Sequence, residues 1–230
     1  MKTVLKDKVV LITGASKGIG FATAELFLKH GAKIAFCDLL KGEILKAKKR
    51  LEKFGEVFAE QADVRKENDI KRFLKGVISR FHRIDILVNN AGILPGRASF
   101  NEHTSLQINN TIDTNLKGTL FMTKAVLGPM LKAKEGIIIN ISSEAGINGY
   151  SEMAIYCATK FGIRGFSEAL EEELSDKGIK VYAVCPGAVK TGLNSGFTGE
   201  EPVGMAPEKV AKLIVGIAST TPADEKCFRI

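Results

Sequence analysis

The segment Thr13-Gly14-Ala15-Ser16-Lys17-Gly18-Ile19-Gly20 stands between a short apolar run, Lys8–Thr13, and a helical pattern over Phe21–His30. The first glycine permits a sharp turn, the second lets a ligand approach the backbone, and the third allows the helix to pack closely on the strand. A helix that begins near Gly18 would direct free N–H groups and the positive end of its dipole at a phosphate. Three glycines alone also occur in ordinary turns. Their place between a strand and a helix predicts a site for the pyrophosphate of a dinucleotide.

Outward from this segment, short apolar runs alternate with longer helical patterns along the whole chain. The runs predict strands at Lys8–Thr13, Lys33–Cys37, Glu56–Ala59, Asp85–Asn89, Gly136–Ile141 and Lys180–Val184. The helical patterns cover Phe21–His30, Glu43–Phe54, Glu67–Phe81, Thr111–Lys134, Tyr156–Asp176 and Glu208–Ala218. Short strands that are apolar throughout, separated by amphipathic helices, are typical of a parallel sheet covered on both faces. Because no linker, repeat or shift in composition interrupts this order, we predict one α/β domain over residues 1–230 with a Rossmann-type doubly wound sheet.

Composition excludes several classes of protein. The 33 Lys and Arg exceed the 26 Asp and Glu by 7, but the basic residues are scattered. Their densest cluster, within Lys46–Lys53, has helical spacing and indicates a solvated helix face, and Trp is absent, so nucleic acid is not a predicted partner. Four cysteines lie far apart without metal-ligand spacing. No apolar stretch approaches the ~18 residues of a membrane span, and no cleavable leader is apparent, so we expect a cytoplasmic protein that binds neither metal nor membrane.

Asp38 is the second candidate for dinucleotide binding. It ends the second predicted strand, where a carboxylate can accept hydrogen bonds from both hydroxyls of an adenosine ribose. Taken alone, Asp38 is better described as a solvated aspartate at a strand end. Its position relative to the glycine segment reverses that interpretation.

Tyr156 and Lys160 form a candidate catalytic pair. They are four residues apart in a predicted helix, so both side chains project from one face. A tyrosine with its ordinary pKa near 10 is a poor base at neutral pH, and a neighbouring ammonium group lowers that pKa. Ser143, at the end of the fifth predicted strand, could hydrogen-bond the same substrate oxygen. The Tyr–Lys spacing is also common by chance, as a tyrosine beside a surface lysine.

At these residues the sequence resembles the short-chain dehydrogenase/reductase family, including its 3-oxoacyl-carrier-protein reductases, along essentially the whole chain. The order and spacing of the motifs agree with the family, including the 13 residues from Ser143 to Tyr156. The matching motifs are Thr13-Gly-Ala-Ser-Lys-Gly-Ile-Gly20, Asp63-Val64, Asn89-Asn-Ala-Gly92, Asn115, Ile141-Ser-Ser143, Tyr156-Cys-Ala-Thr-Lys160 and Pro186-Gly-Ala-Val-Lys-Thr191.

The resemblance implies a role for each matched residue. Tyr156 would exchange a proton with the substrate oxygen, and Ser143 would orient that oxygen. Lys160 would lower the tyrosine pKa and hold the nicotinamide ribose, while Asn115 would hold a water that links this lysine to solvent. The implied cofactor-binding residues are Gly14, Ser16, Lys17, Gly18, Ile19, Gly20, Asp38, Asp63, Val64, Asn90, Ala91, Gly92, Tyr156, Lys160, Pro186, Gly187, Val189 and Thr191.

The choice between NAD and NADP rests on residues that oppose each other. Asp38 would bind the free ribose diol of NAD and repel the 2′-phosphate of NADP. Lys17 resembles the basic position with which family members hold that phosphate, and Lys41 could reach it as well. A carboxylate facing a phosphate at short range costs several kcal/mol, whereas an exposed lysine gains only ~1 kcal/mol. We therefore predict a preference for NAD with residual use of NADP.

The C-terminus departs from the family pattern. Family members usually have a seventh strand and a glycine-bearing tail after the last helix, whereas this sequence reaches Ile230 soon after the predicted helix Glu208–Ala218. A seventh strand is therefore expected to be short. Because that edge often pairs subunits into tetramers in the family, we expect a homodimer, or a weakened homotetramer, built on the helices Thr111–Lys134 and Tyr156–Asp176.

The predicted function is hydride transfer between a nicotinamide cofactor and a carbonyl or secondary alcohol, with Tyr156 as general acid or base. A non-catalytic dinucleotide sensor on the same fold is the alternative, and the intact set of Ser143, Tyr156 and Lys160 favours the enzyme. A small to medium substrate is expected, and an acyl-carrier-protein thioester stays open as a partner. Arg97 and Lys190 could attract an acidic carrier, or be ordinary surface charges. Candidate pocket residues, each of which could equally serve packing, are Leu94, Tyr150, Met153, Phe197 and Met205.

Overall fold

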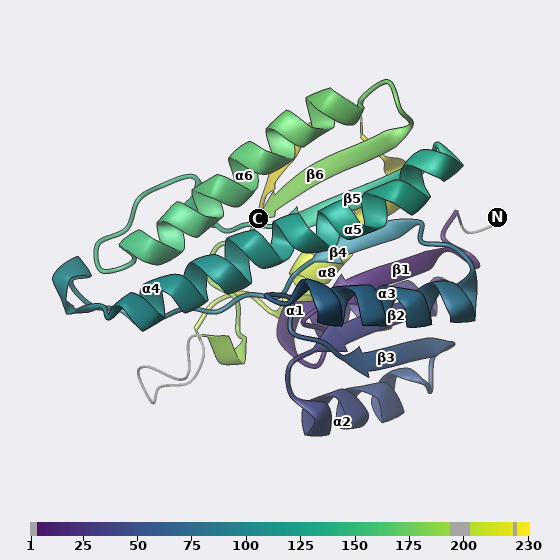
Figure 1. Ribbon diagram of the computed structural model, residues 1–230, viewed down its shortest axis with the longest axis horizontal. Coiled ribbons are helices and arrows are strands. Elements are labelled where there is room, and N and C mark those ends of the chain that lie inside the picture. Colours follow the sequence, from purple (N-terminus) through teal and green to yellow (C-terminus); the bar gives the residue numbers. More distant parts are fainter. Residues whose placement is uncertain (1–3, 194–202, 223–224) are drawn as a thin grey trace.

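The computed structural model describes residues 4–193, 203–222 and 225–230. These residues build one parallel sheet in the order β3-β2-β1-β4-β5-β6-β7, with every neighbouring pair parallel (Figure 1). The strands are β1 (Val9–Thr13), β2 (Lys33–Asp38), β3 (Val57–Gln61), β4 (Ile86–Asn89), β5 (Gly136–Ile141), β6 (Ile179–Cys185) and β7 (Cys227–Arg229).

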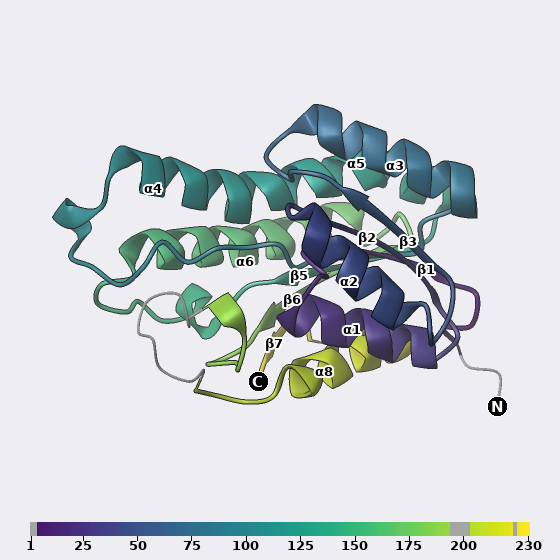
Figure 2. The same cartoon turned by 90° about the horizontal axis from the view of Figure 1, so that it is seen from below.

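Helices cover both faces of the sheet. Figure 2 shows α1 and α8 on one side, with α3, α5 and α6 on the other. The α-helices are α1 (Gly18–Lys29), α2 (Lys41–Leu51), α3 (Glu67–Phe81), α4 (Ser105–Thr111), α5 (Gly118–Ala133), α6 (Ala154–Leu174) and α8 (Pro207–Thr220). Short 3-10 turns, η1 (Phe100–Glu102) and η3 (Glu144–Gly146), complete the loops, together with a π-helical segment, η2 (Ile112–Lys117). Among the described helices, none combines the length and apolarity required to cross a membrane.

The alternation of side chains along each strand explains the two layers. Val10 and Ile12 of β1 pack with α1, α2 and α8, whereas Val9 and Leu11 pack with α3, α5 and α6. Because every residue of β1 is buried, the strand is apolar on both faces, as a central parallel strand requires. The Rossmann-type doubly wound fold predicted from the sequence is confirmed.

The strand order creates a crevice beside β1. The chain proceeds from β1 to β2 and β3 toward one edge, then crosses to β4 and continues toward the other edge. The connections that follow β1 and β4 therefore leave in opposite directions, and ligands of open α/β sheets bind at such a reversal, beyond the carboxyl ends of the strands.

Two regions differ in detail from a simple α/β alternation. The helical region predicted near Thr111–Lys134 begins earlier, at Ser105, and consists of α4, η2 and α5 in succession, with a wider π turn in the middle. The seventh strand was expected to be short, and β7 has three residues, paired with Ala183–Cys185 of β6.

Candidate active site

The glycine segment forms a tight turn between β1 and α1. Gly14 and Gly18 have left-handed backbones, with φ of 69° and 58°. A Cβ on Gly20 would stand 2.5 Å from the carbonyl oxygen of Gly14, so only glycine fits there. No side chain caps the N-terminus of α1, and the buried Ser16 hydroxyl has no hydrogen-bond partner among the described residues. Free N–H groups and an unmatched hydroxyl at a helix N-terminus fit the pyrophosphate of a dinucleotide.

The turn is held from the neighbouring strand. The amide of Asn90 donates to the carbonyl oxygens of Thr13 and Gly14, at 3.0 and 2.8 Å. In return, the Thr13 hydroxyl accepts from the backbone N–H groups of Asn90 and Ala91, both at 3.0 Å. These four hydrogen bonds fasten the glycine turn to the end of β4.

Asp38 lies at the end of β2 in a fixed orientation. Its carboxylate accepts from the backbone N–H of Ser16 at 3.1 Å and from that of Leu39 at 2.7 Å. The side chain is half-buried and lines the cavity; Lys17 lines the same cavity, with an exposed side chain. The carboxylate is thus anchored beside the glycine segment, and the lysine is not.

Asp63 is buried and paired with Arg65. The guanidinium donates to both carboxylate oxygens, through Nε at 2.9 and 3.1 Å and Nη2 at 2.7 Å. Arg65 therefore lowers the pKa of the Asp63 carboxyl. A further bond from Arg65 Nη1 to Asn110, at 3.1 Å, connects this pair to α4. Arg65 lines the cavity, although we did not predict it as a site residue.

Ser143, Tyr156 and Lys160 meet at the opposite end of the crevice. Tyr156 and Lys160 are buried on the same face of α6, with Nζ of the lysine 5.4 Å from the centre of the tyrosine ring. The ammonium group also donates to the carbonyl oxygen of Ile141 at 2.8 Å. Ser143, which follows β5, accepts from the N–H of Ala145 at 3.1 Å. One hydroxyl, one phenol and one ammonium group therefore border the same space.

Burial dominates the proton affinities of this cluster. It raises the pKa of Tyr156 to about 12, with the Ser143 hydroxyl acting in the opposite direction. It also lowers the pKa of Lys160 to about 8. At neutral pH the phenol holds its proton and the ammonium is charged. The expected lowering of the tyrosine pKa by Lys160 stays a prediction.

Asn115 lies behind this cluster, in the π-helical segment. Its amide pairs with the backbone of Ile93, accepting from N at 2.7 Å and donating to O at 2.9 Å, and also donates to the Thr159 hydroxyl at 3.2 Å. A Cβ on Gly92 would stand 3.3 Å from Asn115 Oδ1 and 3.8 Å from Lys160 Nζ, so both polar groups border the same glycine. π-Helical turns are frequent at functional sites, and here the turn presents Asn115 to the loop after β4.

The segment after β6 closes the crevice. The carbonyl oxygen of Pro186 accepts from the N–H of Glu144 at 2.8 Å, which ties this segment to the one that carries Ser143. A Cβ on Gly18 would stand 3.1 Å from Cγ2 of Thr191, so the glycine turn and the segment after β6 lie side by side there. Met205 packs against the hydrophobic core, and its backbone forms a parallel β-bridge with Val189. It is therefore a packing residue rather than a pocket residue.

These groups line one cavity of about 1100 Å³. All the predicted site residues border it except Ser16, Gly20 and Asn115, which lie behind its wall. Its volume exceeds the roughly 300–1,000 Å³ of ordinary ligand pockets and suits a dinucleotide with a small substrate. Of the candidate pocket residues, Leu94, Tyr150 and Met153 line this cavity, and Phe197 lies outside the described residues.

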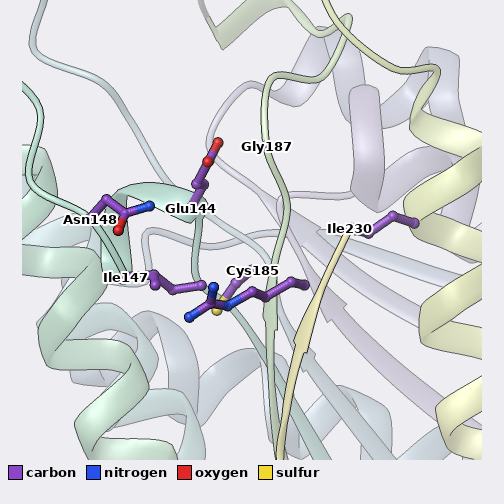
Figure 3. Close-up of a pocket in the computed structure, with 7 residues that line it drawn as sticks. Glu144, Ile147, Asn148, Cys185, Gly187 and Ile230 are labelled. Atoms are coloured by element: carbon purple, nitrogen blue, oxygen red, sulfur yellow. The ribbon is translucent and has the colours of Figure 1, made fainter.

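A second cavity of about 200 Å³ adjoins the first, and Figure 3 shows its lining. Glu144 and Gly187 border both cavities and so stand between them. Glu144 was not among the predicted site residues, although a charged residue directly after Ser143 was a signal for it. The remaining lining residues of the small cavity are Ile147, Asn148, Cys185, Arg229 and Ile230.

The family model described as short chain dehydrogenase matches residues 8–201. The chain belongs to the short-chain dehydrogenase family. Its members are oxidoreductases that use a nicotinamide cofactor, and the glycine turn, the unmatched Ser16 hydroxyl and the size of the cavity fit such a cofactor. Family membership, together with the catalytic set, favours an oxidoreductase over the sensor that was the alternative.

Individual relatives agree. The 3-oxoacyl-[acyl-carrier-protein] reductase of Synechocystis sp. is 37% identical over 210 residues, 86% of this chain and 81% of that protein. The crystal structure of 3-ketoacyl-(acyl-carrier-protein) reductase from Brucella melitensis, complexed with NADH, is 27% identical with a TM-score of 0.91 and covers 98% of this chain and 97% of its own. The closed form of serine dehydrogenase complexed with NADP+ is 30% identical, with a TM-score of 0.89 and coverages of 96% and 94%. The predicted resemblance to 3-oxoacyl-carrier-protein reductases is confirmed.

Proposed function

We propose that this short-chain dehydrogenase interconverts a carbonyl compound and its secondary alcohol, with Tyr156 as the general acid or base. The observation that carries the proposal is the meeting of half-buried Ser143 with buried Tyr156 and Lys160 at the end of the cavity opposite the Asp38 and Asp63 end. When bound, the nicotinamide cofactor supplies a hydride to the carbonyl carbon or accepts one from the alcohol carbon.

The protein moves the proton. In reduction, the Tyr156 phenol donates its proton to the carbonyl oxygen, which the Ser143 hydroxyl holds in place. The tyrosine pKa of about 12 keeps this proton available at neutral pH. In oxidation the phenol must give up that proton to accept the alcohol proton, and the charged Lys160 beside the ring stabilises the resulting anion. Asn115 would position the lysine and a linking water.

The residues around the cavity would hold the cofactor along its length. We propose that the turn from Gly14 to Gly20 binds the pyrophosphate, Asp63 and Val64 the adenine, and the segment Pro186–Thr191 the nicotinamide. The described residues would then act as one NAD(P)-binding oxidoreductase domain. The cytoplasmic location and the homodimer or weakened homotetramer expected from the sequence stay predictions.

We propose NAD as the preferred cofactor, with NADP used residually. Asp38 supports this because two backbone N–H groups hold its carboxylate where the ribose hydroxyls would bind. A phosphate placed there would face a fixed negative charge, at a cost of several kcal/mol. Lys17 is exposed and would return only ~1 kcal/mol.

Two substrate classes follow from the relatives and the cavity. A small to medium ketone or secondary alcohol fits the space beside Leu94, Tyr150 and Met153. The Synechocystis relative favours an acyl-carrier-protein thioester as the second class. Arg97 lines the cavity and Lys190 does not, so Arg97 is the better placed of the two for an acidic carrier.

The experiment that tests the proton transfer is Tyr156→Phe, which removes only the phenol oxygen. We expect turnover to fall by roughly 10²–10⁴-fold with cofactor affinity unchanged. Tyr182→Phe is the matched control, because its phenol bonds the Pro222 carbonyl oxygen away from the cavity, and it should keep its activity. A Tyr156→Phe enzyme that retains more than about a tenth of the activity would show that another group moves the proton.

A further inference from the structure

Glu144 stands at the reacting end of the cavity on a rigid backbone. It directly follows Ser143 and begins the turn η3, and its N–H donates to the carbonyl oxygen of Pro186 at 2.8 Å. The Ser143 side chain caps the same turn by accepting from Ala145. The backbone of Glu144 is therefore fixed relative to the proposed proton-transfer group.

The carboxylate of Glu144 points along the wall between the two cavities. Its Oε2 lies 3.5 Å from the place where a Cβ on Gly187 would stand. In Figure 3 the side chain extends away from Ile147 and Cys185. The phenol of Tyr150 lines the same space, and its pKa is raised by desolvation and, next, by its hydrogen bond to the Glu144 carboxylate.

Among the described residues, the Glu144 carboxylate has the Tyr150 phenol as a hydrogen-bond partner and no paired cation. Among the described residues, three carboxylates line the large cavity. Besides Glu144 these are Asp63, which Arg65 neutralises, and Asp38, which two N–H groups hold. Within the described parts of the chain, Glu144 forms no ion pair. Arg97 and Lys160 line the same large cavity and Arg229 lines the small one, but none of them is ion-paired with Glu144. A carboxylate that faces a binding site without an ion-pair partner is matched by a cation on the ligand.

We propose that Glu144 determines specificity, by selecting substrates that carry an ammonium group close to the reacting carbinol or carbonyl carbon. This inference rests on the proposed function and assigns its substrate class as amino alcohols and amino ketones. A fatty thioester gains nothing from this carboxylate, because the chain next to its reacting carbon is apolar. The ammonium group and Glu144 would form a charge-assisted hydrogen bond.

Three alcohols of matched shape test the proposal. Isopropanolamine, sec-butanol and β-hydroxybutyrate share one secondary alcohol and differ in a cationic, neutral or anionic end. We expect the wild type to prefer isopropanolamine, measured as kcat/KM from the absorbance of reduced nicotinamide. In Glu144→Gln the ratio of isopropanolamine to sec-butanol should fall about ten- to a hundredfold, the range of a charged hydrogen bond.

Arg97→Gln is the charge-matched control. Arg97 lies in the loop after β4 and lines the same cavity. Its replacement lowers the charge of the cavity by one, whereas Glu144→Gln raises that charge by one. A direct contact with Glu144 predicts a much smaller change in the ratio for Arg97→Gln. Equal and opposite changes in the two variants would show that the cavity field acts at long range, and would overturn the proposed contact.

A binding measurement separates failure of this inference from failure of the proposed function. Turnover of sec-butanol with a ratio that Glu144→Gln leaves unchanged would overturn the role of Glu144 and keep the oxidoreductase. If no alcohol is oxidised, we would measure how far isopropanolamine, with NAD present, raises the melting temperature of the wild type and of Glu144→Gln. A shift that depends on Glu144 supports the subsite and counts against the reaction, and the absence of any such shift overturns both.

Discussion

Replacing Lys160 with methionine should make the protein more stable at neutral pH while it abolishes activity. Lys160 is 4% exposed, and burial lowers its pKa from the ordinary 10.5 to about 8. The unfolded chain therefore binds this proton more tightly than the folded protein does. The cost to stability is fully present below pH 8, disappears as the pH rises toward 10.5, and amounts to about 3 kcal/mol.

The net gain is smaller, because the lysine also makes a contact. Its Nζ donates to the Ile141 carbonyl oxygen at 2.8 Å, and the loss of that bond costs about 1 kcal/mol. Methionine has a similar length and fills a buried space without a charge. Lys160→Met should therefore raise the free energy of unfolding at pH 7 by about 2 kcal/mol.

The assay is urea unfolding of both proteins near pH 7 and near pH 9.5, at one protein concentration. The advantage of Lys160→Met should shrink by about 2 kcal/mol between the two pH values. The buried thiol of Cys37 has a raised pKa and destabilises both proteins at high pH, so its contribution cancels in the difference. Cys185 also has a raised pKa, but its charge interacts with Lys160, so its contribution does not cancel completely. Lys46→Met is the control, because Lys46 is 74% exposed and its loss should change stability by less than about 0.5 kcal/mol at both pH values.

One result would refute the reasoning. If Lys160→Met is less stable than the wild type at neutral pH, or its advantage does not vary with pH, then burial does not penalise the ammonium group. The lysine would then contribute to the fold in its charged form.

Three further predictions concern the cofactor, the pH profile and assembly. Asp38→Ala should move the ratio of kcat/KM for NAD and NADP toward NADP. Glu43→Ala is the control, because it removes a carboxylate that lies outside the cavity but interacts with Lys17, and it should move the ratio little. An equal shift in both variants would contradict a direct contact between Asp38 and the ribose. For reduction, kcat/KM should decline as the pH rises through about 8, because Lys160 loses its charge there, and a flat profile across that pH would exclude this role. Light scattering should find a dimer, or a tetramer that dissociates on dilution, because the edge strand β7 has only three residues with which to pair subunits. A salt-resistant tetramer at nanomolar concentration would contradict a weakened interface at this edge.

The sequence predicts the layers of the fold well, because each buried parallel strand is a continuous apolar run. The first strand was expected at Lys8–Thr13 and is β1, Val9–Thr13. The glycine turn was also predictable, since its conformation at Gly14 and Gly18 requires residues without a side chain. Such features depend on residues that are close together in the chain.

Features that depend on distant contacts were not predictable. The π-helical turn at Asn115 coincides with its bonds to Ile93 and Thr159, which lie 22 and 44 residues away. The upward shift in the pKa of Tyr156 follows from burial, which the spacing to Lys160 does not reveal. Met205 is apolar in either environment, and only packing shows that it belongs to the core.

The clamp between Asn90 and the glycine turn has a thermodynamic consequence. Thr13 and Asn90 are 77 residues apart, so their bonds form when the chain folds and the turn has its shape before any ligand arrives. Ordering a loose backbone costs about 1–2 kcal/mol per residue, and for a turn of this length that would consume most of the roughly 8 kcal/mol of a micromolar affinity. The entropic cost of ordering this turn is therefore part of folding and does not reduce the affinity for the dinucleotide. A variant such as Asn90→Ala should weaken dinucleotide binding chiefly through entropy, which calorimetry can measure.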